Sequence, residues 1–148
     1  MDMESPLDFL GPILDLVVIF VSYCITLLVT RKNNKKQSYN NDRKALFEAL
    51  LELRNLVLDR YQDETVLTKQ ETIKIDNKIS CLLTTVCHCH NELLKKSPHI
   101  EKGDKKIRSY YVKMRQAASL DVGGDAKSRI LKLDEYTNSA RSAFPEKH

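Results

Sequence analysis

The pattern of hydrophobic and polar positions begins with one long apolar run, residues 9–30, which carries a single charged residue. Fourteen of its 22 residues are Leu, Ile, Val or Phe. As a helix the run would be roughly 33 Å long, enough for a hydrocarbon core of about 30 Å. Its apolar side chains favour insertion by about 4 to 8 kcal/mol, against a cost of about 3 kcal/mol for a central Asp. The run therefore predicts a transmembrane helix, whose residues include Phe9, Ile13, Asp15, Phe20 and Thr30.

The charges on either side of the run predict its orientation. Four basic residues follow it closely, and no Lys or Arg precedes it; the four are Arg31, Lys32, Lys35 and Lys36. The positive-inside rule then places the C-terminal body in the cytoplasm and residues 1–8 outside, as a short acidic tip. A cleaved signal peptide would need a basic start and a shorter apolar core, so we expect a permanent single-pass anchor. Asp15 lies near one end of the run, where we expect an interfacial carboxylate; a polar contact to a partner helix is the alternative.

The polar segment that follows the run, residues 31–41, shows no apolar periodicity. We predict that it is a basic juxtamembrane linker. Its basic side chains can each contribute about 1 kcal/mol of attraction to anionic lipid headgroups. The lipid bilayer is therefore the first expected partner of the chain.

The rest of the chain shows helical rather than alternating periodicity. Apolar residues recur every three or four positions in four segments, residues 42–61, 68–96, 104–120 and 125–143. In the first segment Leu51, Leu56 and Leu58 widen the apolar face, which indicates packing on more than one neighbour. The predicted fold is all-α, with one N-terminal transmembrane helix followed by a small cytoplasmic helical bundle of about four helices. This domain covers residues 42–144, and residues 145–148 are expected to fray.

The second of these segments has the clearest pattern. Thr68 and Glu71 form the sequence signature of a capping box, which predicts that the helix starts there. Six apolar residues then follow one face with a period of 3.5 over about three heptads. This helix-pairing seam consists of Ile75, Ile79, Leu82, Val86, Cys89 and Leu93. We expect the seam to form either the core of the bundle or a coiled coil with another copy.

Composition adds a charge asymmetry to this picture. Residues 1–30 contain four acidic residues and no basic one, whereas residues 31–148 hold all 24 basic residues against the other 16 of the 20 acidic ones. An acidic, apolar start joined to a basic body indicates a membrane or a polyanion as partner. Basic residues between positions 95 and 115 raise the possibility of nucleic acid. No recognised reading motif accompanies them, so we expect the anionic membrane surface and not nucleic acid.

The residues best suited to metal binding or redox chemistry form a group of cysteines and histidines. They are Cys81, Cys87, His88, Cys89 and His90. They lie within a strong helical pattern, where Cys87 and His90 share a face and His88 points elsewhere. One helix can therefore supply two ligands, whereas structural zinc sites use four. We expect cysteines that act as small core residues, and no metal or other cofactor. Cys87 and His90 remain the candidates for a metal site.

The sequence predicts no catalytic residues and no small-molecule substrate. No Ser stands in a Gly-flanked elbow, and the acidic residues alternate with Lys and Arg as on solvated helix faces. We therefore predict a non-enzymatic, single-pass protein-interaction module that binds a partner or itself at the cytoplasmic membrane face. One alternative is a small membrane-active protein, such as a pore-forming, lysis or toxin-like protein, that acts through its transmembrane helix. Another is a metal or redox sensor that uses the Cys/His group.

Overall fold

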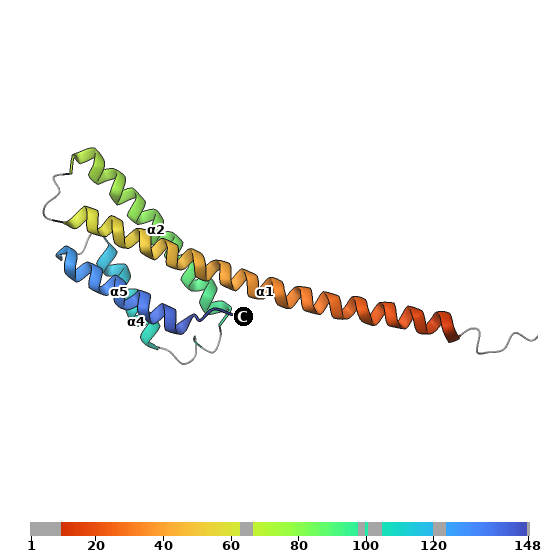
Figure 1. Ribbon diagram of the computed structural model, residues 1–148. Helices are drawn as coiled ribbons and strands as arrows, with labels where there is room; N and C mark the ends of the chain where they lie inside the picture. The colour runs from red at the N-terminus through yellow and green to blue at the C-terminus, as the bar shows by residue number, and fades with distance from the viewer. Residues whose placement is uncertain (1–9, 63–66, 98–99, 101–104, 120–123, 148) are drawn as a thin grey trace, which may run out of the picture. The chain divides into compact units, whose positions relative to one another are not determined.

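The computed structural model describes residues 10–62, 67–97, 100, 105–119 and 124–147, and these residues contain helices and no strands (Figure 1). The helices are α1 (Leu10–Tyr61), α2 (Lys69–Lys95), α4 (Lys105–Ala118) and α5 (Ala126–Ala143). The all-α prediction is confirmed. The chain divides into two compact units, Met1–Ser38 and Tyr39–His148, and α1 contributes to both. The predicted acidic tip and Phe9 lie outside the described residues.

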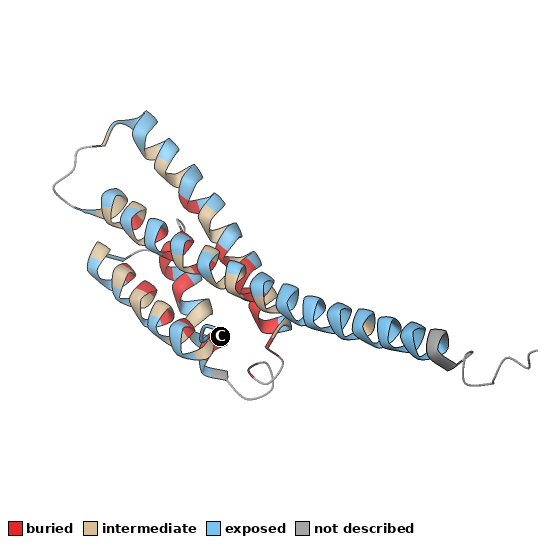
Figure 2. Cartoon of the chain, turned by 45° about the vertical axis from the view of Figure 1, so that its right-hand side comes forward, coloured by how far each residue is buried: buried red, intermediate tan, exposed pale blue. Residues whose placement is uncertain are grey.

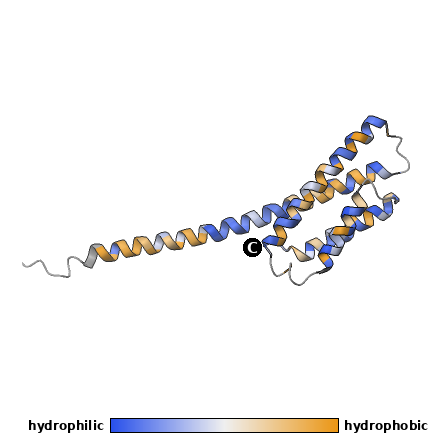
Figure 3. Ribbon diagram, turned by 180° about the vertical axis from the view of Figure 1, so that it is seen from behind, coloured by the Kyte–Doolittle hydropathy of each residue, from blue (hydrophilic) through white to orange (hydrophobic). Residues whose placement is uncertain are grey.

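The first unit contains the apolar part of α1. Nearly every described side chain between positions 13 and 30 is exposed, including Ile13, Asp15, Phe20 and Thr30 (Figure 2). Hydropathy colouring shows an apolar stretch followed by a polar stretch along the same helix (Figure 3). By length and composition α1 is apolar enough to cross a membrane, and none of its most apolar window is buried within the chain. The predicted long apolar helix near the N-terminus is therefore present.

The predicted linker, residues 31–41, differs from expectation because α1 runs through it as helix. The segment at 42–61 is therefore the continuation of α1 and not a separate helix. Five of the 11 residues are Lys, Arg or Gln, which are good helix formers, whereas four are Asn, which is a weaker one. Backbone hydrogen bonding within a helix needs no apolar face. The available signal was that residues 13–97 contain neither Gly nor Pro. That signal is insufficient alone, since α1 ends at Tyr61 without either residue.

Local capping explains where two of the other helices begin. The backbone N–H of Glu71 donates to the Thr68 hydroxyl at 3.3 Å, and the backbone N–H of Thr68 donates to the Glu71 carboxylate at 2.9 Å. The predicted capping box of α2 is thus confirmed. Asp125 caps α5 by accepting from the Ser128 backbone N–H at 3.2 Å.

From Tyr39 onward the helices form an antiparallel bundle. Ion pairs join α1 to α2 near both ends of α2, between Arg60 and Asp76 at 2.8 Å and between Lys96 and Asp42. On another side of α1, Arg54 pairs with Asp134 of α5 at 3.0 Å. Helix α4 packs most closely against α5. The order of helices around the bundle is therefore α1, α2, α4, α5, with each neighbour running in the opposite direction.

The core of this bundle accounts for the apolar seam of α2. Ile79, Val86, Cys89 and Leu93 are buried in it, and Ile75 and Leu82 are half-buried against it. The other helices supply further buried side chains, among them Leu46, Leu53, Val57, Ile107, Met114 and Leu133. The seam therefore belongs to the chain's own core; the sequence left open whether it would form this core or a coiled coil with another copy.

The segment after α5 returns to α1. The side-chain amide of Asn40 donates to the Lys147 carbonyl at 2.9 Å and accepts from the Lys147 N–H at 3.2 Å. The Lys147 ammonium lies 3.8 Å from the ring centroid of Tyr39, which is only 1 % exposed. These contacts of Lys147 differ from the frayed end that we expected for residues 145–148, of which His148 lies outside the described residues. Tyr39, assigned to the linker by its sequence context, is a core residue.

Candidate functional site: a groove between α1 and α5

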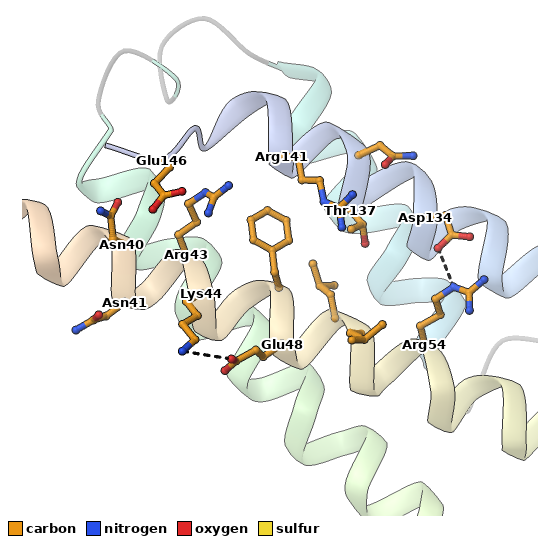
Figure 4. Close-up of a pocket in the computed structure, with 14 residues that line it drawn as sticks. Asn40, Asn41, Arg43, Lys44, Glu48, Arg54, Asp134, Thr137, Arg141 and Glu146 are labelled. Atoms are coloured by element: carbon orange, nitrogen blue, oxygen red, sulfur yellow. Dashed lines mark hydrogen bonds and ion pairs between the residues drawn. The ribbon is translucent and has the colours of Figure 1, made fainter. Parts of the chain in front are cut away.

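A groove of about 820 Å³ lies between α1 and α5 within the second unit (Figure 4). Its α1 wall runs from Asn40 to Arg54, and its other wall comes from α5 and Glu146. Residues three or four apart on α1 share this face, so the wall extends over about four helical turns, or roughly 20 Å. The groove is therefore elongated along the helices.

Three apolar side chains of α1 line the groove, and we call them its floor. They are Phe47, Leu50 and Leu51. Leu50 belongs to the core, Phe47 is half-buried, and Leu51 is 63 % exposed. The different exposure of these three side chains follows from the broad apolar face predicted for this part of α1, because α2 and α5 cover only part of that face. Leu51 is left as an uncovered apolar side chain.

Two arginines hold their guanidinium groups over the same aromatic ring. The Arg43 guanidinium lies 5.1 Å from the Phe47 ring centroid, and the Arg141 guanidinium lies 5.8 Å from it. Arg43 also donates from Nε to the carbonyl of Phe144 at 2.8 Å, which fixes its side chain. The cation–π contacts hold two positive charges beside the Phe47 ring, and both arginines line the groove.

The other charges that line the groove are largely paired with one another. Arg54 is bound to Asp134 at 3.0 Å, and Lys44 lies 3.8 Å from Glu48 in an exposed pair. Arg141 has no carboxylate within ion-pair distance among the described residues. Outside these two pairs the groove is lined by two arginines, Arg43 and Arg141, and by one carboxylate, Glu146, so the remaining charge is net positive.

A second polar cluster lies inside the bundle around His90, which is only 2 % exposed. Its ring stacks on Tyr111 at 4.2 Å and 4°, and Nδ1 lies 2.8 Å from the Tyr136 hydroxyl. Burial, together with the positive charge of Arg108, lowers the pKa of His90 to about 4. The imidazole is therefore neutral near pH 7 and serves as a hydrogen-bonded aromatic ring of the core.

The two candidate metal ligands, Cys87 and His90, both lie near Tyr111. The Cys87 thiol accepts from the Asn91 side-chain amide at 3.6 Å. Burial, together with the neighbouring Cys87 thiol, raises the pKa of Tyr111 to about 12. Burial also raises the pKa of Cys89. In the part of the chain that the structure describes, no group of three or more His, Cys, Asp or Glu side chains gathers to hold a metal ion.

One buried charge was missed by the sequence reasoning. Arg129 of α5 is 4 % exposed and donates to the carbonyls of Ala117, Ser119 and Gly124 at 2.6, 3.0 and 3.1 Å. Its guanidinium lies 4.0 Å from the Tyr61 ring centroid. This side chain satisfies carbonyls at the C-terminal end of α4 and ties the α4–α5 connection to α1. Nothing in the local sequence distinguishes it from the exposed arginines.

The predicted juxtamembrane basic residues all lie on α1. Arg31, Lys32 and Lys35 are exposed, and Lys36 is half-buried. Comparison with known proteins adds no relative to this picture: no family model, curated protein or solved structure matches the chain.

Proposed function

We propose that this chain is a single-pass, membrane-anchored, non-enzymatic interaction module that binds a protein partner at the cytoplasmic membrane face. The observation that carries the proposal is the exposure of the apolar part of α1. Thirteen of the exposed large hydrophobic side chains fall within residues 13–29. Monomeric soluble proteins rarely expose apolar patches beyond a few hundred Å², whereas a lipid bilayer would cover all of these side chains.

The charges that follow the apolar stretch support the orientation. Residues 31–36 contain four basic residues and no acidic one, and such residues are retained on the cytoplasmic side. The bundle follows this cluster in the sequence, so it would lie on the same side. Membrane anchoring raises the local concentration of the bundle near the bilayer, where modest affinities become effective.

The packing of the bundle supports an interaction surface outside the seam. The seam residues of α2 are buried in the chain's own core or packed against it, so they are not free to pair with another helix. The groove between α1 and α5 retains an apolar floor, an exposed Leu51 and charged walls. Apolar floors with polar rims are typical of surfaces that bind partner helices.

The membrane claim can be tested with a C-terminally tagged full chain. We expect it to stay in the membrane pellet after alkaline carbonate extraction, and the tag to be digested by protease added to the cytoplasmic face. Substitution of Arg31, Lys32, Lys35 and Lys36 by Gln should weaken the orientation bias. Recovery of the chain in the carbonate supernatant, or protection of the tag, would contradict the proposal.

Deletion of residues 39–148 separates the proposal from the membrane-active alternative. If the chain is an interaction module, the truncated chain should no longer co-purify with any partner that the full chain retains in detergent-solubilised membranes. A pore-forming or lysis protein should instead keep its ability to permeabilise vesicles when only residues 1–38 remain. Permeabilisation by this truncated chain, with no partner lost, would favour the alternative.

A further inference from the structure

We infer that the groove between α1 and α5 binds an acidic amphipathic helix of a protein partner, with a carboxylate held by Arg43 and Arg141. This inference rests on the proposed interaction function and specifies the chemistry of the partner. The apolar face of that helix would cover Phe47 and Leu51. A Glu or Asp three or four residues away would then reach the two guanidinium groups.

The shape of the groove favours a helix as the occupant. Its walls are two antiparallel helices, and its α1 wall runs for about four turns, roughly the length over which a short helix can lie. Strand addition requires an exposed sheet edge, and the described residues contain no strand. An elongated groove with an apolar floor and charged walls matches the stripe of an amphipathic helix.

The charges favour an acidic partner over a basic one. Asp134 is bound to Arg54, and Glu48 faces Lys44, so two of the three carboxylates that line the groove already have a basic neighbour. The guanidinium groups of Arg43 and Arg141 lie on either side of one aromatic ring, and Glu146, the third carboxylate, lies on the Arg43 side (Figure 4). An incoming carboxylate would be attracted by both positive charges and could accept charge-assisted hydrogen bonds from the guanidinium groups. The bundle as a whole is also basic, with 20 basic and 16 acidic residues in positions 39–148.

The floor residue Leu51 provides the apolar half of the recognition. A Leu side chain exposed by 63 % beside a half-buried Phe47 would lose water contact under a bound helix. Its substitution should weaken binding without disturbing the core, because it is already mostly in solvent. Charge and apolar contact can therefore be tested separately on two residues of the same groove.

The test uses the full chain in mild detergent and two fluorescein-labelled peptide probes. Both are Ala-based helices of about 18 residues with Leu at positions i, i+3, i+4 and i+7. One carries Glu beside the Leu stripe and the other carries Lys. We expect fluorescence anisotropy to show binding of the Glu peptide and not of the Lys peptide. Arg141→Glu should weaken Glu-peptide binding about tenfold or more and favour the Lys peptide.

Matched variants make the test specific. Leu51→Gln should weaken Glu-peptide binding about tenfold while the chain keeps its circular dichroism spectrum. Arg115→Gln, an exposed arginine of α4 outside the groove, should leave binding unchanged. Absence of Glu-peptide binding, or equal binding by wild type and both groove variants, would overturn the inference. Displacement of the peptide by glycerophosphoserine at matching concentrations would also overturn it and assign the groove to a lipid phosphate.

These outcomes are independent of the membrane claim. Detergent keeps the chain in solution whether or not it spans a bilayer, so the peptide assay reports on the groove alone. Carbonate extraction reports on the anchor alone. A chain that binds the Glu peptide but leaves the membrane in carbonate would refute the anchoring and retain the groove inference.

Discussion

Acidification should destabilise the bundle through the buried imidazole of His90. Burial lowers the pKa of this group from 6.5 to about 4 in the folded chain. The unfolded chain therefore binds a proton at a higher pH than the folded chain does, and stability falls as pH decreases from about 6.5 towards about 4. The Tyr136 hydroxyl at 2.8 Å and the stacked Tyr111 ring at 4.2 Å enclose the imidazole and leave little room for water around an added charge.

The size of the effect follows from the two pKa values. A shift of about 2.5 units corresponds to about 3 kcal/mol in total, at about 1.4 kcal/mol per unit. Between about pH 7.5 and about pH 5, the proton linkage gives a loss of about 2 kcal/mol. For a domain of about 110 residues, this loss should lower the melting temperature by roughly 8 °C. Glu71 and Glu92 have lowered pKa values and lose their contributions mainly at lower pH.

The assay is thermal unfolding of the full chain in detergent, followed by circular dichroism at several pH values. The comparison is the double variant His90→Phe with Tyr136→Phe, which removes the titrating group and its hydrogen-bond partner together. Its melting temperature should change much less between pH 7.5 and pH 5. His88→Gln removes an exposed imidazole two residues away and should retain the wild-type pH dependence. The reasoning is refuted if the double variant loses as much stability on acidification as the wild type.

Four further substitutions test the packing and the helix capping of the bundle by chemical or thermal unfolding in detergent. Leu82→Lys should destabilise the chain by about 2 kcal/mol or more because it places a charge against the core, whereas Leu51→Lys should change stability by less than about 0.5 kcal/mol. Equal effects would contradict the assigned faces. Arg129→Met should cost about 2 to 4 kcal/mol because three backbone carbonyls lose their donor; a neutral result would show that water replaces the guanidinium. Thr68→Ala should cost about 1 kcal/mol through loss of the capping box, and an unchanged unfolding midpoint would argue against that cap.

The groove between α1 and α5 is only partly visible in the sequence. The widened apolar face around Leu51 indicates more than one neighbour, and this is visible in the sequence. The partner residue Arg141 lies far along the chain, in a segment whose apolar stripe is weak. Only the antiparallel packing of α5 on α1 brings its guanidinium over the Phe47 ring.

The sequence by itself determined the features that depend on neighbours within a few residues. The apolar stretch, the helical class and the capping box at Thr68 all follow from composition and from spacing over one or two turns. The continuity of α1 through residues 31–41 was missed because apolar periodicity reports packing and not helix formation.

Only the tertiary structure decided which polar residues are buried and which surfaces remain open. His90 meets Tyr136 46 positions later, and Asn40 meets Lys147 107 positions later. No local pattern encodes such contacts, because the free energy of burying His90 or Arg129 depends on partners supplied by other helices. The same helix packing that buries these side chains leaves Leu51 exposed between α1 and α5.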